Sequence, residues 1–288
     1  MTHRHFPSRI WLLSLLLPLA AQAQIGVRHF EAPLDQSHWK VTGTPLECRL
    51  SHAIPGWGEA VFSRPAGGSL SVRLEPARRL AVDSAQVVSQ PPPWKHNVPS
   101  QMLGRVHAAK GEVWLAAKTA LAGKMLASLK QGLSPTVYYP AGADARVSVA
   151  LSTVNFTPSL EKFMKCDEAL LPQGFDTLRR STLHFGGDRD ILNAEARRRL
   201  DLLASWVKLD RQVARVRIDG YSDASGSPRD NYLLSKARAL AVRKYLIRAK
   251  VPAAKIRMRY HGQRQAAASN ATAEGRARNR RVVVRLDR

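Results

Sequence analysis

An acidic and a basic residue, Asp223 and Arg238, flank what reads as a strand-to-helix turn. The strand pattern ends near Gly220, and Ser and Pro residues at 225–228 turn the chain into a long helical pattern. The turn can fold the carboxylate back beside the guanidinium. Such a pair can hold a zwitterion, because a carboxylate accepts an ammonium group and a guanidinium binds a carboxylate in bidentate geometry. A plain salt bridge that fixes the turn is the alternative, and spacing alone favours it.

The elements that must position this pair alternate between strands and helices from about Leu171 onward. Strand patterns cover 182–187, 213–220, 255–262 and 280–287, and helical patterns cover 193–210 and 231–247. In the first helical pattern, Leu200, Leu203 and Val207 share one face. This alternation predicts a compact α/β unit.

Residues 25–151 carry shorter and more broken patterns that favour strands. Apolar side chains alternate with polar ones at Val72 and Leu74, after turn residues at 65–68. One helical stretch is expected at about 113–130. We therefore expect a β-rich domain, either a sandwich or a partial barrel, with one helix.

The first 23 residues have the pattern of a cleaved signal peptide. Basic residues precede an apolar run from Ile10 to about Ala21, and the segment 21–23 reads Ala-Gln-Ala. The run is shorter than the roughly 20 apolar residues of a membrane span. An uncleaved anchor is the alternative interpretation. We expect residues 1–23 to be removed and the mature chain to be exported.

A length of 288 residues fits two domains after this removal, a β-rich one at 24–168 and an α/β one at 172–288. The net charge is +23, and the basic residues recur through the predicted elements rather than forming a block or tail. Such a surface suits any polyanion. We expect it to be mostly a solvated face, including the run 197–199; a secondary role in adhering to anionic wall polymer is the alternative. Export and the lack of a helix-turn-helix, zinc or base-stacking signature argue against a physiological role in nucleic-acid binding.

Cys48 and Cys166 are the only cysteines. An even number in an exported chain favours a disulfide, and this one would close a loop of about 120 residues. Two buried free thiols are the alternative. Neither cysteine has a second metal ligand at short spacing, so we expect no metal site and no cofactor.

Three separated blocks of sequence resemble the OmpA-like peptidoglycan-binding domain: DGYSDASG at 219–226, the helical pattern from 231, and GRARNRRVVV at 275–284. That family has a Gly-x-Thr-Asp-x-x-Gly turn, an Asn-x-x-Leu-Ser-x-x-Arg-Ala helix and an Asn-Arg-Arg-Val strand. The matching positions are Gly220, Asp223, Gly226, Asn231, Leu234, Ser235, Arg238, Ala239, Asn279, Arg280, Arg281 and Val282. The resemblance covers roughly 177–288, with the blocks in the family's order and spacing.

This resemblance implies a ligand and roles for four residues. Asp223 and Arg238 would hold the free amino-acid end of diaminopimelate in the peptidoglycan stem peptide, which is a zwitterion. Asn231 and Asn279 would support the pocket through hydrogen bonds.

The chain departs from the family pattern just before the aspartate, where Tyr221 and Ser222 replace a common His-Thr pair. Ser222 keeps a hydroxyl group at its position. Tyr221 is larger and changes the wall of the expected pocket, which affects affinity rather than the class of ligand.

Residues 32–68, above all the run TPLECRLSH at 44–52, resemble the N-terminal domain of a family of periplasmic flagellar motor proteins. This resemblance implies a periplasmic protein associated with the flagellar basal body and the cell wall. Its N-terminal domain would bind a basal-body ring protein such as MotX, and its C-terminal domain would bind the wall. Together they would hold ion-driven stator units in place. A general periplasmic wall anchor unconnected with flagella is the alternative.

Catalysis is not expected. Glycan hydrolysis normally needs two carboxylates that flank the bond; Asp219 and Asp223 lie on the same side of a strand, but Asp219 can equally be solvated. Ser51 and His52 are adjacent without an acidic residue that completes a triad. The histidines show no zinc-protease spacing.

Overall fold

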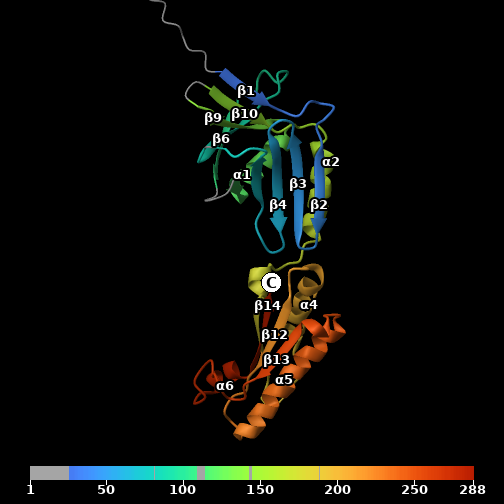
Figure 1. The fold of residues 1–288 in the computed structure, drawn as a ribbon, viewed down its shortest axis with the longest axis vertical. Coiled ribbons are helices and arrows are strands. Elements are labelled where there is room, and N and C mark those ends of the chain that lie inside the picture. Colours follow the sequence, from blue (N-terminus) through green and yellow to red (C-terminus); the bar gives the residue numbers. More distant parts are fainter. Residues whose placement is uncertain (1–25, 81, 109–113, 143–144, 188) are drawn as a thin grey trace, which may run out of the picture.

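The protein is described here by a computed structural model that covers residues 26–288 except 81, 109–113, 143–144 and 188. The expected signal peptide, 1–23, lies outside the described residues. A β-rich domain and an α/β domain follow one another along the long axis (Figure 1). The expected fold class is therefore confirmed.

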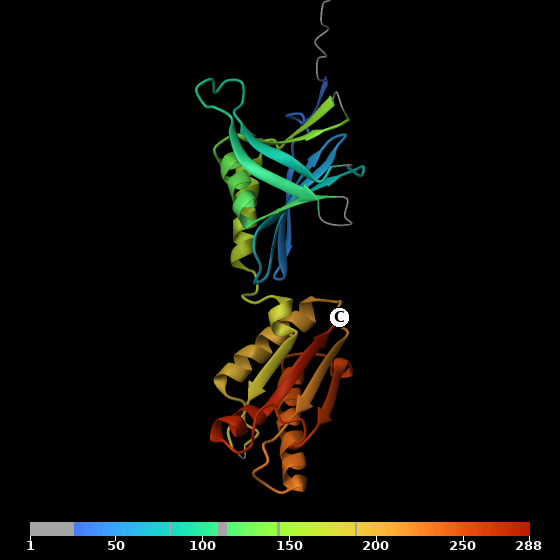
Figure 2. The same ribbon diagram turned by 90° about the vertical axis from the view of Figure 1, so that its left-hand side faces the viewer.

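Among the described residues, the N-terminal domain is built on one ten-stranded sheet. Its strands are β1 (Gly26–Phe30), β2 (Trp39–Thr44), β3 (Glu47–Ile54), β4 (Gly58–Pro65), β5 (Ser71–Pro76), β6 (Ser84–Gln90), β7 (Gln101–Ala108), β8 (Leu115–Lys118), β9 (Ser134–Pro140) and β10 (Ala145–Ala150). They lie in the order β1-β10-β9-β6-β7-β8-β5-β4-β3-β2, and only β1 and β10 pair in parallel. The sheet bends strongly around its helices (Figure 2), so this domain is a partial barrel.

The helix expected at 113–130 is shorter than predicted. Residues 115–118 form β8, which pairs with β5 and β7, and helix α1 begins only at Thr119 and ends at Lys130. Leu121, Met125 and Leu129 bury one face of α1 in the core. Sheet pairing thus overrides the helical pattern of the first residues, because the strand needs those backbone groups for its ladder.

A second helix, α2 (Phe156–Glu168), was not predicted from the sequence. Its Phe156, Leu160 and Phe163 recur at helical spacing and are buried against β2 and β3. Ser159 donates a hydrogen bond from its hydroxyl to the carbonyl of Trp39 at 3.1 Å. The helical period was present in the sequence, but it follows a strand pattern directly without a side-chain N-cap.

The predicted disulfide between Cys48 and Cys166 is present, with the two Cα atoms 5.9 Å apart. It joins β3 to the last turn of α2. A Cβ added at Gly43, which pairs with Cys48 across the ladder, would lie 2.2 Å from the Cys166 sulfur. Asp167 also accepts from Arg64 at 2.9 Å. These contacts fix the point at which the chain leaves the N-terminal domain.

The core beneath α2 contains a buried histidine. His52 is fully buried, and its ring stacks on Trp39 with centroids 4.5 Å apart. Its Nδ1 lies 3.1 Å from the carbonyl of His38, and its Nε2 lies 3.4 Å from the amide nitrogen of Ser152. A neutral ring satisfies both contacts by donating from Nδ1 and accepting at Nε2. Burial lowers the pKa of His52, and the bond to His38 opposes this shift.

The C-terminal domain packs its two long helices on one face of a four-stranded sheet (Figure 2). In chain order its elements are α3 (Phe175–Leu178), β11 (Arg180–His184), α4 (Ala194–Leu209), β12 (Arg215–Gly220), α5 (Pro228–Arg248), the 3-10 turn η1 (Ala253–Lys255), β13 (Ile256–Tyr260), α6 (Ala273–Asn279) and β14 (Arg281–Asp287). The sheet order is β11-β14-β12-β13, with β12 and β13 parallel and β14 antiparallel to both its neighbours. Val216 and Ile218 face the helices.

The turn between β2 and β3 and the turn between β4 and β5 both lie against the segment that leads into the second domain. The amide of Leu171 donates to the carbonyl of Pro45 at 2.8 Å, and Ala66 is buried with the C-terminal core. Gly67 has a φ of +62°, and a Cβ there would lie 2.3 Å from the backbone nitrogen of Gly174. Only glycine permits this close approach between the two domains.

Arg199 is not part of a solvated face, contrary to the prediction for the run 197–199. Its guanidinium donates to the hydroxyl of Ser181, the side-chain oxygen of Gln173 and the carbonyl of Thr177 at 3.0–3.1 Å. Trp206 also donates, from its indole Nε1 to the carbonyl of Gln173 at 3.0 Å. Helix α4 therefore holds the interdomain segment, a long-range role that helical spacing does not reveal.

Removing the disulfide is expected to destabilise the N-terminal domain. The Cys48→Ala/Cys166→Ala variant should lose about 2–5 kcal/mol of unfolding free energy, because the unfolded chain regains the freedom of a long loop. Urea unfolding followed by tryptophan fluorescence measures this loss. Reductant should shift the wild-type midpoint toward that of the variant and leave the variant unchanged; equal midpoints for oxidised and reduced wild type would contradict the prediction.

His52 is expected to make the stability of this domain depend on pH. The folded-state pKa lies below the unfolded value of about 6.5, so the unfolded chain binds more protons as pH falls below that value. Stability should therefore be constant above about pH 6.5 and decrease below it. Urea midpoints measured from pH 5 to 8 should show a smaller slope for His52→Gln. The exposed His96→Gln variant is the control, and an unchanged slope in His52→Gln would disprove the assignment.

Candidate functional site

The candidate site begins where β12 meets α5. A Cβ at Gly220 would lie 2.2 Å from the carbonyl oxygen of Ser235, so this strand and helix can pack so closely only with glycine. Ser227 caps α5 by accepting from the amide of Asp230 at 3.1 Å, and Pro228 occupies the first helical turn. The turn at 221–227 is therefore held at both ends.

Asp223 lies in this turn with only 7% of its surface exposed. Its Oδ2 accepts from the guanidinium of Arg280 at 2.9 Å, and its Oδ1 accepts from the amide of Ser225 at 3.3 Å. Arg280 also donates from Nε to the carbonyl of Phe185 at 3.3 Å. The buried carboxylate is thus neutralised by the residue that precedes β14.

Arg238 is fully buried, on the side of α5 that faces the sheet. Its guanidinium donates to the backbone carbonyls of Arg189 at 3.1 Å, Tyr221 at 3.3 Å and Gly186 at 3.1 Å, and also to that of Gly187. Its Cζ lies 5.6 Å from the ring centroid of Phe185. The loop after β11 and the turn after β12 are therefore both bound to one guanidinium.

The structure brings Asp223 and Arg238 to the same group of loops and gives Asp223 the ion-pair partner Arg280. Binding of a zwitterion by Asp223 and Arg238 stays a prediction. Arg238 reaches the carbonyl of Tyr221, two positions before the aspartate. Arg280 was among the matched family positions but had no predicted role. Helical spacing in the sequence is enough to place Arg238 near the turn after β12. The approach of Arg280 to Asp223 depends on the path of the chain just before β14, which local spacing does not show.

Asn231 connects two loops of the site. It is 3% exposed, and its Nδ2 donates to the carbonyl of Gly226 at 2.9 Å and to Oε1 of Gln263 at 2.7 Å. The turn after β12 is thereby joined to the loop after β13. Its support of a ligand pocket stays a prediction.

Asn279 holds a third loop and is fully buried. Its Oδ1 accepts from the amides of Ala267 at 2.7 Å and Ala268 at 3.0 Å, and its Nδ2 donates to the carbonyl of Ala268 at 2.8 Å and to Oδ1 of Asn270 at 2.9 Å. The same Asn270 oxygen accepts from the amide of Ala224 at 3.1 Å. This chain of bonds connects Asn279 to the turn that carries Asp223.

Tyr221 and Ser222 form the buried wall behind Asp223. The ring of Tyr221 lies between His261, stacked at 4.7 Å, and the guanidinium of Arg281, whose Cζ lies 3.9 Å from the ring centroid. Burial lowers the pKa of Arg281 from its ordinary value, and Tyr221 opposes that shift. The Oγ of Ser222 is buried and has no hydrogen-bond partner among the described residues.

Asp219 is not solvated, which corrects the alternative considered from the sequence. It is 6% exposed, and its carboxylate pairs with Arg285 at 2.5 Å and with Nε2 of His261 at 3.2 Å. Asp219 and Asp223 therefore have separate partners. In the part of the chain that the structure describes, no group of three His, Cys, Asp or Glu residues is placed to hold a metal ion, and no helix is long and apolar enough to cross a membrane.

Both domains have recognisable relatives. Residues 184–280 match the OmpA family, and residues 30–172 match the MotY N-terminal domain family. The chain is thus an OmpA-type domain joined to the N-terminal domain of a flagellar protein. It is 31% identical to the sodium-type flagellar protein MotY of Vibrio parahaemolyticus over 280 residues, which cover 95% of this chain and 94% of that protein. The chain belongs to the MotY family.

Other relatives share only the second domain. The outer-membrane lipoprotein YfiB of Pseudomonas aeruginosa is 34% identical over 115 residues, 40% of this chain and 68% of that protein. The crystal structure of the peptidoglycan-associated lipoprotein of Burkholderia pseudomallei covers 37% of this chain and 89% of its own, at 24% identity and a TM-score of 0.36.

Replacing Asn279 is expected to destabilise the C-terminal domain strongly. Asn279→Ala removes four hydrogen bonds and leaves buried loop groups unpaired, which should cost about 2–4 kcal/mol. Asn193→Ala, which removes the N-cap of α4, is a control expected to cost about 1 kcal/mol. Urea unfolding monitored by far-UV circular dichroism compares them. A smaller loss for Asn279→Ala than for Asn193→Ala would show that this network is not structurally important.

Proposed function

We propose that this protein is a periplasmic component of the flagellar motor that anchors the basal-body ring and the stator units to the cell wall. Membership of the MotY family and the OmpA-type domain support this function. In this proposal residues 1–23 are removed on export, the domain at 24–168 binds the motor, and the domain at 172–288 binds peptidoglycan without covalent chemistry.

The wall ligand is the zwitterionic end of diaminopimelate in the stem peptide. Asp223 accepts its ammonium group, and the guanidinium of Arg238 binds its carboxylate. The observation that carries this proposal is the convergence of both charged groups, buried and held by backbone contacts, on the turn after β12. The buried Ser222 hydroxyl, which has no partner among the described residues, lies beside them and would gain one from a polar ligand.

Arg280 and the loop after β11 must adapt when this ligand binds. Arg280 pairs with the same carboxylate that would accept the ammonium group. The guanidinium of Arg238 donates to carbonyls at 186, 187 and 189, so the ligand carboxylate has to compete with them. Because a carboxylate is a stronger acceptor than a neutral carbonyl, this exchange favours the ligand.

The N-terminal domain is proposed to bind a basal-body ring protein such as MotX and to contribute to holding the stator. Its β6–β7 hairpin exposes apolar side chains, with Trp94 74% and Met102 52% exposed. Exposed aromatic and Met side chains are enriched at protein interfaces. A wall anchor unconnected with flagella remains the second candidate, and the presence of the chain in purified basal bodies separates the two.

Co-sedimentation with isolated peptidoglycan sacculi at physiological salt tests the wall site. Asp223→Asn keeps the side-chain shape but loses the charge that binds the ammonium group. It should bind at least about tenfold more weakly than wild type, as expected for loss of one partner of a buried charge pair. Free diaminopimelate should compete with the sacculi for wild type.

Asp176→Asn is the matched control, because it makes the same chemical change at a carboxylate that is 92% exposed in the same domain. It should bind as wild type does. Arg238→Lys, which keeps the charge but loses bidentate geometry, should also weaken binding. If all variants sediment equally and dissociate together as salt rises, only general charge attraction holds the protein, and the zwitterion site is wrong.

A further inference from the structure

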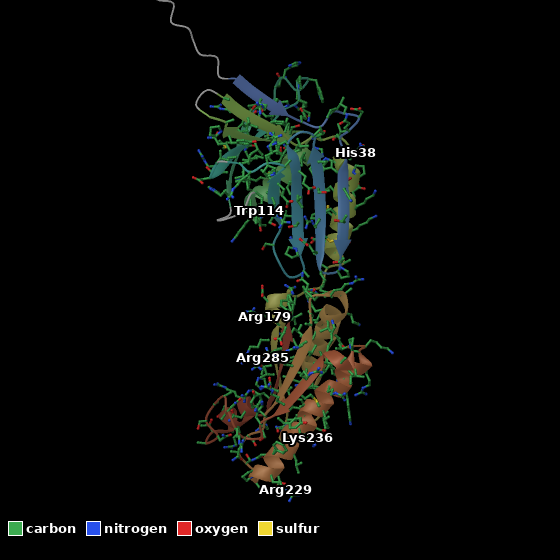
Figure 3. All side chains as sticks on the ribbon, viewed as in Figure 1. His38, Trp114, Arg179, Arg229, Lys236 and Arg285 are labelled. Carbon is green, nitrogen blue, oxygen red and sulfur yellow. A yellow bond between two sulfur atoms is a disulfide. The ribbon has the colours of Figure 1, made fainter. Side chains whose placement is uncertain are left out.

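The face of the C-terminal sheet opposite its helices carries one arginine from each strand in a single row. Arg180 pairs with Arg285, Arg285 with Arg217, and Arg217 with Arg257. Neighbouring strands lie about 4.8 Å apart, so the backbones of these four arginines follow one another across the sheet at that interval. We call these four residues the arginine row. No described helix covers it (Figure 2), and Figure 3 shows Arg285 on this side and Lys236 on α5.

Like charges directly opposite one another destabilise a sheet, and two carboxylates offset part of this repulsion. Asp219 pairs with Arg285 at 2.5 Å, and Asp287 pairs with Arg217 at 2.6 Å. Both inner arginines are therefore neutralised. Among the described residues, neither outer arginine, Arg180 or Arg257, has a carboxylate within 4.0 Å.

The surroundings of the row add further positive charge. Arg215 and Arg259 lie on the same face, two residues to either side of the row: Arg215 precedes Arg217 on β12, and Arg259 follows Arg257 on β13. A groove of about 520 Å³ runs over β14, β12 and β13 on this face, and five of its eight lining residues are arginines and two are Asp219 and Asp287. Arg180, at the edge of the sheet, lines a separate hollow beside α4. The groove is thus an open, positively charged surface whose charges are regularly spaced.

We propose that the arginine row binds a linear acidic glycan that lies across the four strands. Guanidinium groups bind carboxylates in bidentate geometry, and a glycan with one carboxylate on each sugar presents its charges at regular, short intervals. An acidic peptide in extended form places same-side residues about 6.8 Å apart, which fits the row less well. This site is separate from Asp223 and does not depend on the wall ligand proposed above.

Fluorescence anisotropy with a labelled oligogalacturonate at physiological salt tests the proposal. The Arg180→Gln/Arg257→Gln variant should bind about fivefold to tenfold more weakly than wild type, as expected for the loss of two exposed charge pairs. Arg198→Gln/Arg211→Gln removes the same charge from exposed positions on α4 and the turn after it. This control should change affinity by less than about twofold.

Three results would overturn the proposal. The first is equal weakening by both double variants, which would mean attraction by net charge alone. The second is tighter binding of polyglutamate or of vesicles rich in anionic lipid, which would favour an acidic protein or a membrane. The third is equal binding of an uncharged maltooligosaccharide. The row variant loses like-charge repulsion, but it also loses the bonds from Arg257 to the carbonyls of Ala254 at 2.9 Å and Ile256 at 3.2 Å. Both bonds are local, so the variant should unfold near the wild-type temperature, and weaker binding will not reflect misfolding. Asp223→Asn should bind the glycan normally and only lose binding to sacculi.

Discussion

Burial of the Arg238 guanidinium dictates how the loops of the C-terminal domain are arranged. A buried charge is tolerated only when its donors have partners, and here the chain provides backbone carbonyls from the loop after β11 and the turn after β12. Those segments must therefore lie at the same end of the sheet. Asp223 is carried there with them, and Arg280 arrives from the start of β14 to neutralise it. The charged site follows from this one requirement.

The two domains are joined by contacts that a flexible linker would not make. The disulfide holds the end of α2 beside β3, Gly67 lets the β4–β5 turn touch the linker, and Arg199 and Trp206 hold Gln173 from the other side. In the proposed function the protein connects a motor to a wall, and force has to pass between its two domains. Short covalent and hydrogen-bonded connections at the junction suit that task.

Four of the basic residues of the second domain become regularly arranged only when its strands pair. In the sequence, Arg180, Arg217, Arg257 and Arg285 are scattered over more than a hundred positions. The register of the four-stranded sheet aligns them, while α4 and α5 occupy the opposite face. Asp219 and Asp287 neutralise only the inner pair. A composition that suggested a diffuse solvated surface is therefore organised in space.

The sequence by itself determined the order of the four strands and two long helices in the second domain, the motif positions from Gly220 to Arg281, and the cysteine pair, because each depends on local period, spacing or residue count. It did not reveal the short helices α3 and α6. Only the tertiary structure decided the partner of Asp223, the role of Arg199 and the alignment of the arginine row. Even helix α2, whose period is visible at Phe156, Leu160 and Phe163, was missed beside a strand pattern. Sheet register and loop packing bring together residues that are far apart in the chain, and short-range periodicity cannot predict such contacts.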